Sequence, residues 1–309
     1  GISRQPGGFF ASVIPDGLLL TPVKENNLSG YTKFERLLIL SVQEALSHTS
    51  ISLRDKRTAF IVSTTKGNIA LLEQGMGADV APMQLYNTAV KTAEFFSAAN
   101  RPVVISNACI SGLLAILIGQ RMIRSGAYDH AVVCGADMLT KFVLSGFQSF
   151  QAVSDEPCRP FDADRKGITL GEGAATVVLT KNKTLLTGKE TIRLGEGASS
   201  NDANHISGPS RTGAELAGAV TKAMRLSGVQ PSDIGFVSAH GTATLYNDEM
   251  EAKAFHLSGL QHVPVNSLKG YYGHTLGAAG LIEAIIGMYG MREEVVIPTA
   301  GFASSGISH

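Results

Sequence analysis

The stretch that decides the fold is RPVVISNACISGLLAILIGQRMIRSG, residues 101–126. Residues 103–105 are a short apolar run typical of a buried strand, and residues 112–124 are a longer apolar segment typical of a helix. Cys109 lies between them, where the free N–H groups and the macrodipole of the helix N-terminus favour a thiolate. The pattern therefore predicts a reactive cysteine with a lowered pKa, although an ordinary buried cysteine also fits it.

Composition restricts the class of protein. The 309 residues are 44% hydrophobic and 17% charged, which is enough apolar material for a large core. Lys and Arg total 26, as do Asp and Glu, and this balance argues against nonspecific binding of nucleic acid. No run approaches about 18 apolar residues, and the first residues lack a signal-peptide pattern. Three widely spaced cysteines fit neither a disulfide framework nor a zinc motif. We expect a cytoplasmic protein without a membrane span or a metal.

Helical and strand patterns alternate along the chain, which implies sheets covered by helices on both faces. A chain longer than about 250 residues usually divides its core, and the polar segment 182–189 marks the division here. We therefore predict two α/β halves of similar order, 1–182 and 183–309, packed as one body. The predicted helices cover 31–48, 85–98, 112–124, 211–227, 247–258 and 276–292, and the predicted strands cover 59–63, 103–105, a segment from Ala131, 173–179, 191–194, 234–238 and 263–266.

Two histidines lie in glycine-rich turns of the second half. His240 occurs in SAHGTATLYNDEMEA and His274 in VNSLKGYYGHTLGAAG, each shortly after a predicted strand. Ligands of open α/β sheets bind beyond the carboxyl ends of the strands, so Cys109, His240 and His274 can converge on one site. A single histidine more often has a structural role. The three positions together favour a cysteine nucleophile served by two imidazoles.

These segments resemble the elongating β-ketoacyl-(acyl-carrier-protein) synthases, the ketosynthases of the thiolase superfamily. The matching stretches, in the family's order, are SNACISG, CRPFDADRKGITLGEGAATVVL, AHGTATLYNDEMEA and VNSLKGYYGHTLGAAG. The resemblance implies a five-layered α/β/α/β/α thiolase-like fold, a homodimer and a decarboxylative Claisen condensation. It also implies an acyl carrier protein as partner, with substrates carried on phosphopantetheine and no further cofactor.

The resemblance further implies roles for individual residues. Cys109 matches the nucleophile that accepts the acyl group, and His240 and His274 match two imidazoles that stabilise an enolate oxygen. We expect both rings to be neutral, because two cations would repel each other. The matching residues that support the histidines are Lys269, Glu251 and Asp248, of which Lys269 and Glu251 are expected to fix tautomer and orientation, and those that hold the pantetheine arm are Thr242 and Thr244.

Two other functions remain open. A non-catalytic partner subunit that controls chain length would lack the nucleophile, so Cys109 counts against it. Another thiolase-superfamily acyltransferase could use acyl-coenzyme A, but the initiating type has asparagine where this chain has His274.

The family also closes with a GFGG-type loop that supplies an oxyanion donor. Residues 301–302 resemble this loop only superficially, and we expect them to belong to the connection after the last helix.

Overall fold

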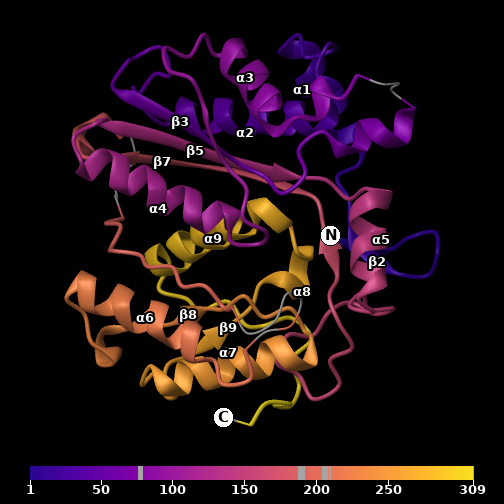
Figure 1. The fold of residues 1–309 in the computed structure, drawn as a ribbon, viewed down its shortest axis with the longest axis vertical. Coiled ribbons are helices and arrows are strands. Elements are labelled where there is room, and N and C mark those ends of the chain that lie inside the picture. Colours follow the sequence, from indigo (N-terminus) through magenta and orange to yellow (C-terminus); the bar gives the residue numbers. More distant parts are fainter. Residues whose placement is uncertain (76–78, 187–191, 204–207, 209, 309) are drawn as a thin grey trace.

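Helices and sheets stack in five layers in a computed structural model, which describes residues 1–75, 79–186, 192–203, 208 and 210–308 (Figure 1). A four-stranded sheet and a two-stranded sheet lie between three layers of helices. This order confirms the predicted α/β/α/β/α arrangement. The outer layer above the larger sheet contains α1 (Asp16–Glu25), α2 (Lys33–Ser47) and α3 (Leu85–Phe95), the middle layer α4 (Ser111–Arg124) and α9 (Ala279–Arg292), and the lower layer α6 (Ala214–Ser227) and α7 (Leu245–Leu257).

The larger sheet has the strand order β4-β3-β5-β7. Strands β4 (Val103–Ile105), β3 (Thr58–Ser63) and β5 (His130–Asp137) are parallel, and β7 (Gly173–Thr180) runs antiparallel to β5. Every residue of β3 and β5 is buried, because α2 covers one face of the sheet and α4 with α9 covers the other. The carboxyl ends of the three parallel strands share one edge, and Cys109 follows β4 at that edge.

The smaller sheet is shorter than predicted. In the described part of the chain it consists of β8 (Val237–Ser238) and β9 (Val265–Asn266), which are parallel. Pro264 precedes β9 and has no N–H for a longer ladder. The predicted strand over 191–194 is wrong for Ile192–Leu194, which are exposed and have no strand conformation, while Thr191 lies outside the described residues.

The remaining elements are short. A three-stranded sheet pairs β2 (Phe10–Ser12) with β1 (Ile2–Arg4) on one side and β6 (Leu170–Gly171) on the other. Two further helices, α5 (Lys141–Ser149) and α8 (Lys269–Tyr272), follow strands β5 and β9. Five 3₁₀ turns complete the described elements: η1 (Ile69–Gln74), η2 (Ala81–Met83), η3 (Lys183–Leu185), η4 (Pro231–Asp233) and η5 (Leu276–Ala278).

The first turn of α4 lies directly against the turn that precedes α9. A Cβ atom added to Gly112 would lie 2.9 Å from the carbonyl oxygen of Gly277, which is closer than a side chain tolerates. Glycine at position 112 thus lets two backbones touch. Cys109 is three residues before this contact and His274 is three residues before its partner, so the contact brings the two candidate residues together.

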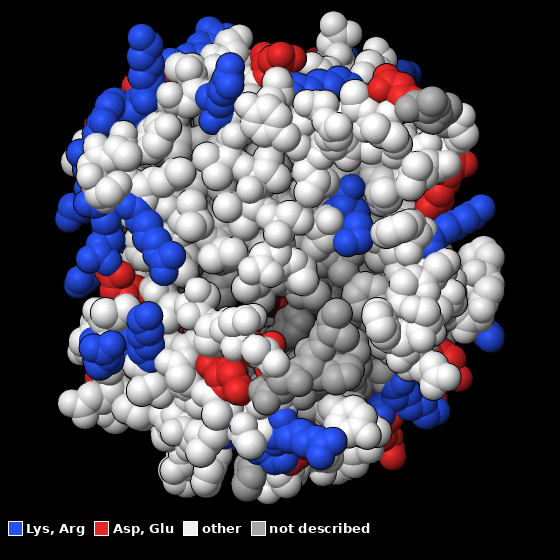
Figure 2. Space-filling view, viewed as in Figure 1, with Lys and Arg blue, Asp and Glu red and all other residues white. Residues whose placement is uncertain are grey.

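Surface charge collects away from this contact. Figure 2 shows Lys and Arg side chains gathered along the left edge of the view, the edge at which α4 ends in Figure 1. Arg57 and Lys181 both pair with Asp129, at 2.6 and 2.5 Å, and Arg124 pairs with Glu196. Cys109 is at the opposite end of α4.

None of the described helices has the length and apolar character required to cross a membrane.

Leu281 of α9 tests how the middle layer is attached to the larger sheet. Its side chain is fully buried in a cluster with residues of α4, β3 and β5. We expect Leu281→Ala to lower the free energy of unfolding by about 2–5 kcal/mol, because the lost methyl groups leave a cavity. Met291→Ala on the same helix, 58% exposed, should change it by about 0.5 kcal/mol or less. Equal denaturant midpoints for the two variants would contradict this account of the core.

Candidate active site

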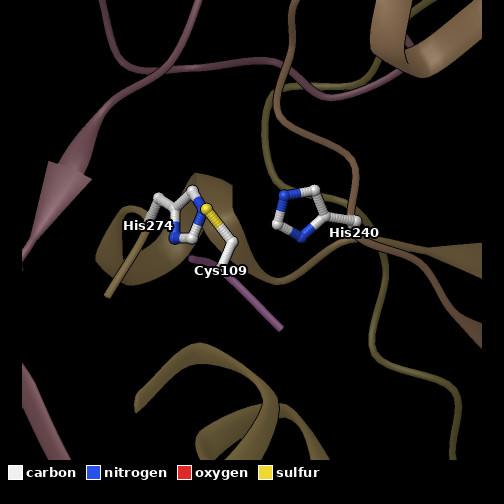
Figure 3. Close-up of side chains that lie close together, drawn as sticks. All are labelled: Cys109, His240 and His274. Carbon is white, nitrogen blue, oxygen red and sulfur yellow. The ribbon is translucent and has the colours of Figure 1, made fainter. Parts of the chain in front are cut away.

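One thiol and two imidazoles converge at the carboxyl edge of the larger sheet. Cys109 Sγ and one ring nitrogen each of His240 and His274 all lie within 4.8 Å of one another. The two rings are 5.0 Å apart between centroids and nearly perpendicular, at 83°. Figure 3 shows the Cys109 side chain beside the two rings. The three residues come from separate segments, after β4, after β8 and after α8, so the predicted convergence is confirmed.

The turn that presents Cys109 is strained and braced. Ala108 has a φ of 45°, a left-handed conformation that costs a non-glycine residue about 1–3 kcal/mol. Ser111, at the start of α4, holds this turn from both sides. Its hydroxyl donates to the Ala108 carbonyl at 2.6 Å and accepts the Asn107 N–H at 2.8 Å. Cys109 is therefore held in one orientation just before the N-terminus of α4.

His274 has a defined tautomer. The Leu276 N–H donates to His274 Nδ1 at 3.0 Å, so the ring proton is on Nε2. The Nε2 atom is buried and has no hydrogen-bond partner among the described residues. Burial, together with the nearby Lys269 and His240, holds the pKa of His274 well below its usual value. The result is a neutral ring with an unused N–H donor beside Cys109.

The backbone around His240 is held by buried charges. The Glu251 carboxylate accepts the N–H groups of His240 and Gly241, at 2.8 and 2.6 Å. Lys269 Nζ donates to the His240 carbonyl at 2.5 Å and pairs with Glu283 at 2.6 Å. Burial and then Lys269 lower the pKa of His240 well below its usual value, so this ring is also neutral.

This geometry corrects one prediction and adds one residue. Lys269 and Glu251 fix the backbone of the His240 loop, whereas the tautomer of His274 is set by a backbone N–H of its own turn. Glu283, the partner of Lys269, was missed from the sequence. A signal for it existed, because Glu283 is the single charge within the apolar run AGLIEAIIGMYGM, and a charge in such a helix is usually paired.

The other predicted residues brace the loop after His240. The Asp248 carboxylate accepts the N–H groups of Phe161 and Thr242, at 2.7 and 3.0 Å, and so ties the loop to a distant segment. Thr242 and Thr244 are hydrogen-bonded to each other, with 2.9 Å between their hydroxyl oxygens. A role of these threonines in binding pantetheine stays a prediction.

The prediction of a lowered thiol pKa is wrong. Burial raises the pKa of Cys109 to about 11, and Asp137 and Glu283 act in the same direction. Lys269 opposes the shift without reversing it. The thiol is half-buried, and its partial loss of contact with water outweighs the support that Lys269 offers a thiolate. The resting site therefore contains a neutral thiol beside two neutral rings.

The same three residues are the donor types of a zinc site. Ligands of a tetrahedral zinc ion lie about 3.3–3.7 Å apart, whereas these atoms are up to 4.8 Å apart. In addition, His274 Nε2 carries a proton because Nδ1 accepts the Leu276 N–H, so Nε2 offers no lone pair to a metal. The arrangement suits hydrogen-bond donation better than metal coordination.

The pH dependence of thiol alkylation tests the electrostatics of the site. With a pKa of about 11, Cys109 has a thiolate fraction about 100-fold below that of an ordinary thiol at pH 8, since each pKa unit is a factor of ten. We expect its alkylation by iodoacetamide, followed by intact mass, to keep rising with pH beyond about pH 9. The urea-unfolded chain is the control, because its thiols have ordinary pKa values. The variant Cys109→Ser shows which residue is labelled in the folded protein. A plateau below about pH 8 would contradict a thiol of this pKa.

Comparison with known proteins gives a consistent result. Residues 21–184 match the family model "Beta-ketoacyl synthase, N-terminal domain", and residues 192–303 match "Beta-ketoacyl synthase, C-terminal domain". A 3-oxoacyl-(acyl-carrier-protein) synthase 2 from Vibrio cholerae is 36% identical over 253 residues, which cover 75% of this chain and 60% of that protein. A putative polyketide beta-ketoacyl synthase 1 from Streptomyces cyaneus is 33% identical over 69% of this chain and 54% of its own length.

A solved structure agrees with these matches. A chain of the complex of the ketosynthase ApeO with its chain length factor ApeC, from Xenorhabdus doucetiae, superposes with a TM-score of 0.73 at 31% identity. The match covers 96% of this chain and 75% of that one. The chain spans 60% and 54% of the length of the two curated relatives. With two family models that together cover most of its residues, and with the motifs around Cys109, His240 and His274 in order, the chain belongs to the beta-ketoacyl synthase family.

Proposed function

We propose that this chain carries the active site of a β-ketoacyl-(acyl-carrier-protein) synthase. The reaction is the condensation of an acyl thioester with a malonyl thioester, with loss of carbon dioxide, in fatty-acid or polyketide-like synthesis. One observation supports it above the others: a thiol lies within 4.8 Å of two imidazole nitrogens, and both imidazoles are neutral. A non-catalytic partner subunit would have no use for this arrangement.

In the first stage Cys109 accepts the acyl group. Its sulfur forms a bond to the acyl carbonyl carbon, the bond from that carbon to the carrier sulfur breaks, and the thiol proton ends on the departing carrier thiol. Because the resting thiol is neutral, this proton must leave as the new bond forms. The Cys109 N–H, two residues before the first residue of α4, is our proposed donor to the carbonyl oxygen during this step.

In the second stage the histidines act as donors. Malonyl thioester releases carbon dioxide, and the electrons of the broken C–C bond place negative charge on the thioester oxygen. His274 Nε2–H, which has no partner in the described residues, is available to this oxygen, and His240 lies beside it. The enolate carbon then bonds to the acyl carbon, the C–S bond to Cys109 breaks, and the sulfur takes up a proton.

The remaining assignments follow from this reaction. We propose an acyl carrier protein as partner, phosphopantetheine as the arm that carries both substrates, and no further cofactor. The name of the Vibrio cholerae relative contains the same carrier. We place the protein in the cytoplasm, because its three cysteines are all free and a reducing compartment keeps them so.

Loss of the nucleophile tests the first stage. Wild-type protein incubated with acyl-carrier thioester should gain the mass of one acyl group, and Cys109→Ala should gain none, because no other thiol reaches this site. Cys134 and Cys158 are buried and serve as internal controls. Acylation that survives Cys109→Ala would refute the proposal, and acylation by acyl-coenzyme A alone would favour another acyltransferase of the superfamily.

Loss of either imidazole tests the second stage. We expect His240→Ala and His274→Ala each to lower malonyl decarboxylation by about 10²–10³-fold, the effect of removing one oxyanion donor. Release of labelled carbon dioxide from malonyl-carrier thioester measures this rate. His262→Ala, at an exposed position, is the matched control. Undiminished decarboxylation in both variants would exclude the donor role.

We further propose that the protein forms a homodimer through β4. In the described residues this strand has a neighbour, β3, on one side only. The Ile105 carbonyl faces β3, since it accepts the Thr64 N–H at 3.2 Å. Adjacent strand residues face opposite ways, so the N–H and carbonyl of Val104 point outward. An exposed edge of this kind readily pairs with a second strand.

Val104→Pro tests this pairing. Proline removes the outward N–H and leaves the hydrogen bonds to β3 in place. We expect the wild-type protein to have the mass of a dimer in light scattering, and Val104→Pro to shift toward the monomer at an unchanged circular dichroism spectrum. A monomeric wild type, or a variant that stays fully dimeric, would contradict pairing through β4.

A further inference from the structure

Asp137 is a buried carboxylate that the proposed reaction does not use. It ends β5 and is 1% exposed. Four donors surround its two oxygens: the Thr64 hydroxyl at 2.8 Å, and the N–H groups of Thr65, Lys66 and Gly277 at 2.9, 3.3 and 2.7 Å. Three of them follow β3, the neighbour of the strand that precedes Cys109. The fourth belongs to the turn after His274, so this one side chain links two segments of the site that are distant along the chain.

The contact with the His274 turn is tight. A Cβ atom on Gly277 would lie 2.7 Å from Asp137 Oδ2 and 2.8 Å from Thr64 Cα, so the carboxylate lies directly against the backbone. The preceding residue, Leu276, is buried and has a φ of 52°, which is strained for leucine. Strained backbone persists only where its surroundings hold it, and here the Asp137 oxygen holds the next N–H.

Two successive N–H groups of this turn have different partners. The Leu276 N–H donates to His274 Nδ1, and the Gly277 N–H donates to Asp137. The first bond determines which ring nitrogen carries the proton. The second bond fixes the orientation of the peptide group between Leu276 and Gly277. If the second bond is lost, the turn can rotate and the first bond weakens.

We propose that Asp137 is a positioning residue for His274. Through the Gly277 N–H it keeps the Leu276 N–H on Nδ1, and so keeps the proton of the ring on Nε2. Asp137 also lies close enough to Cys109 that its carboxylate contributes to raising the pKa of that thiol. The consequence for catalysis rests on the proposed function, whereas the effect on the tautomer does not.

Nitrogen NMR of the histidine rings tests the proposal without reference to activity. In wild-type protein labelled with ¹⁵N-histidine, the His274 ring should show one protonated and one unprotonated nitrogen, assigned by their loss in His274→Gln. In Asp137→Asn an amide NH₂ group replaces one of the two carboxylate oxygens. This NH₂ group cannot accept the hydrogen bonds that the surrounding donors offer, so the Gly277 turn loosens. The two His274 nitrogen resonances should then move toward each other as the proton exchanges between them.

Asp162→Asn is the matched control. Asp162 is also 1% exposed and accepts backbone N–H groups, from Ala303 and Ser304 at 2.7 and 3.1 Å, but it does not contact the His274 turn. We expect it to lower the unfolding midpoint and to leave the His274 resonances in place. Thr64→Val removes only one donor to Asp137, so it should move the two His274 nitrogen resonances toward each other by less than Asp137→Asn does. This variant provides the test if Asp137→Asn does not fold.

Kinetics separate positioning from general damage. Malonyl decarboxylation by Asp137→Asn should fall about 100-fold, because a misplaced donor loses most of its effect, while acylation of Cys109 is retained. His274 resonances that are unchanged in Asp137→Asn, or in Thr64→Val where only that variant folds, would overturn the proposal. If the wild type neither acylates nor decarboxylates, the proposed function fails, and the tautomer result still decides the role of Asp137.

Discussion

The site depends on one close contact between two segments that are distant along the chain. The first turn of α4 touches the turn after His274 through Gly112 and Gly277, where no side chain fits between the backbones. This contact places a helix that begins after Cys109 against a turn that begins at His274. The Asp137 carboxylate reinforces it from the end of β5. The contact thereby brings the segment of the nucleophile against the segment of one imidazole donor.

The electrostatics of the site follow from burial. Cys109 and His240 are half-buried and His274 is buried, and all three favour their neutral forms, so the pKa of the thiol rises and those of the rings fall. Lys269 is fully buried, yet its charge is matched by Glu283 and directed to a backbone carbonyl. A neutral, preorganised pocket of this kind can respond to negative charge that develops on a substrate oxygen.

Much of the fold could be predicted from local patterns. The long helices around Leu38, Ile116 and Ile285 have apolar residues at helical spacing, and the buried strand β5 is almost entirely apolar. Shorter features could not be predicted in this way. Ile192 and Leu194 alternate like a strand but are exposed, and the strand near Val265 is short because Pro264 precedes it. A strand requires a partner, which no local pattern supplies.

The sequence by itself determined which side chains enter the site, because Cys109, His240 and His274 stand in motifs that each follow a strand. The alternation of helices and strands also predicted sheets covered by helices, and the resemblance of the motifs to the ketosynthases implied the five-layer order. Only the tertiary structure decided the charge and proton state of these groups. The pKa of Cys109, the tautomer of His274 and the pairing of Lys269 with Glu283 depend on atoms distant along the chain, because burial and hydrogen bonding act through space.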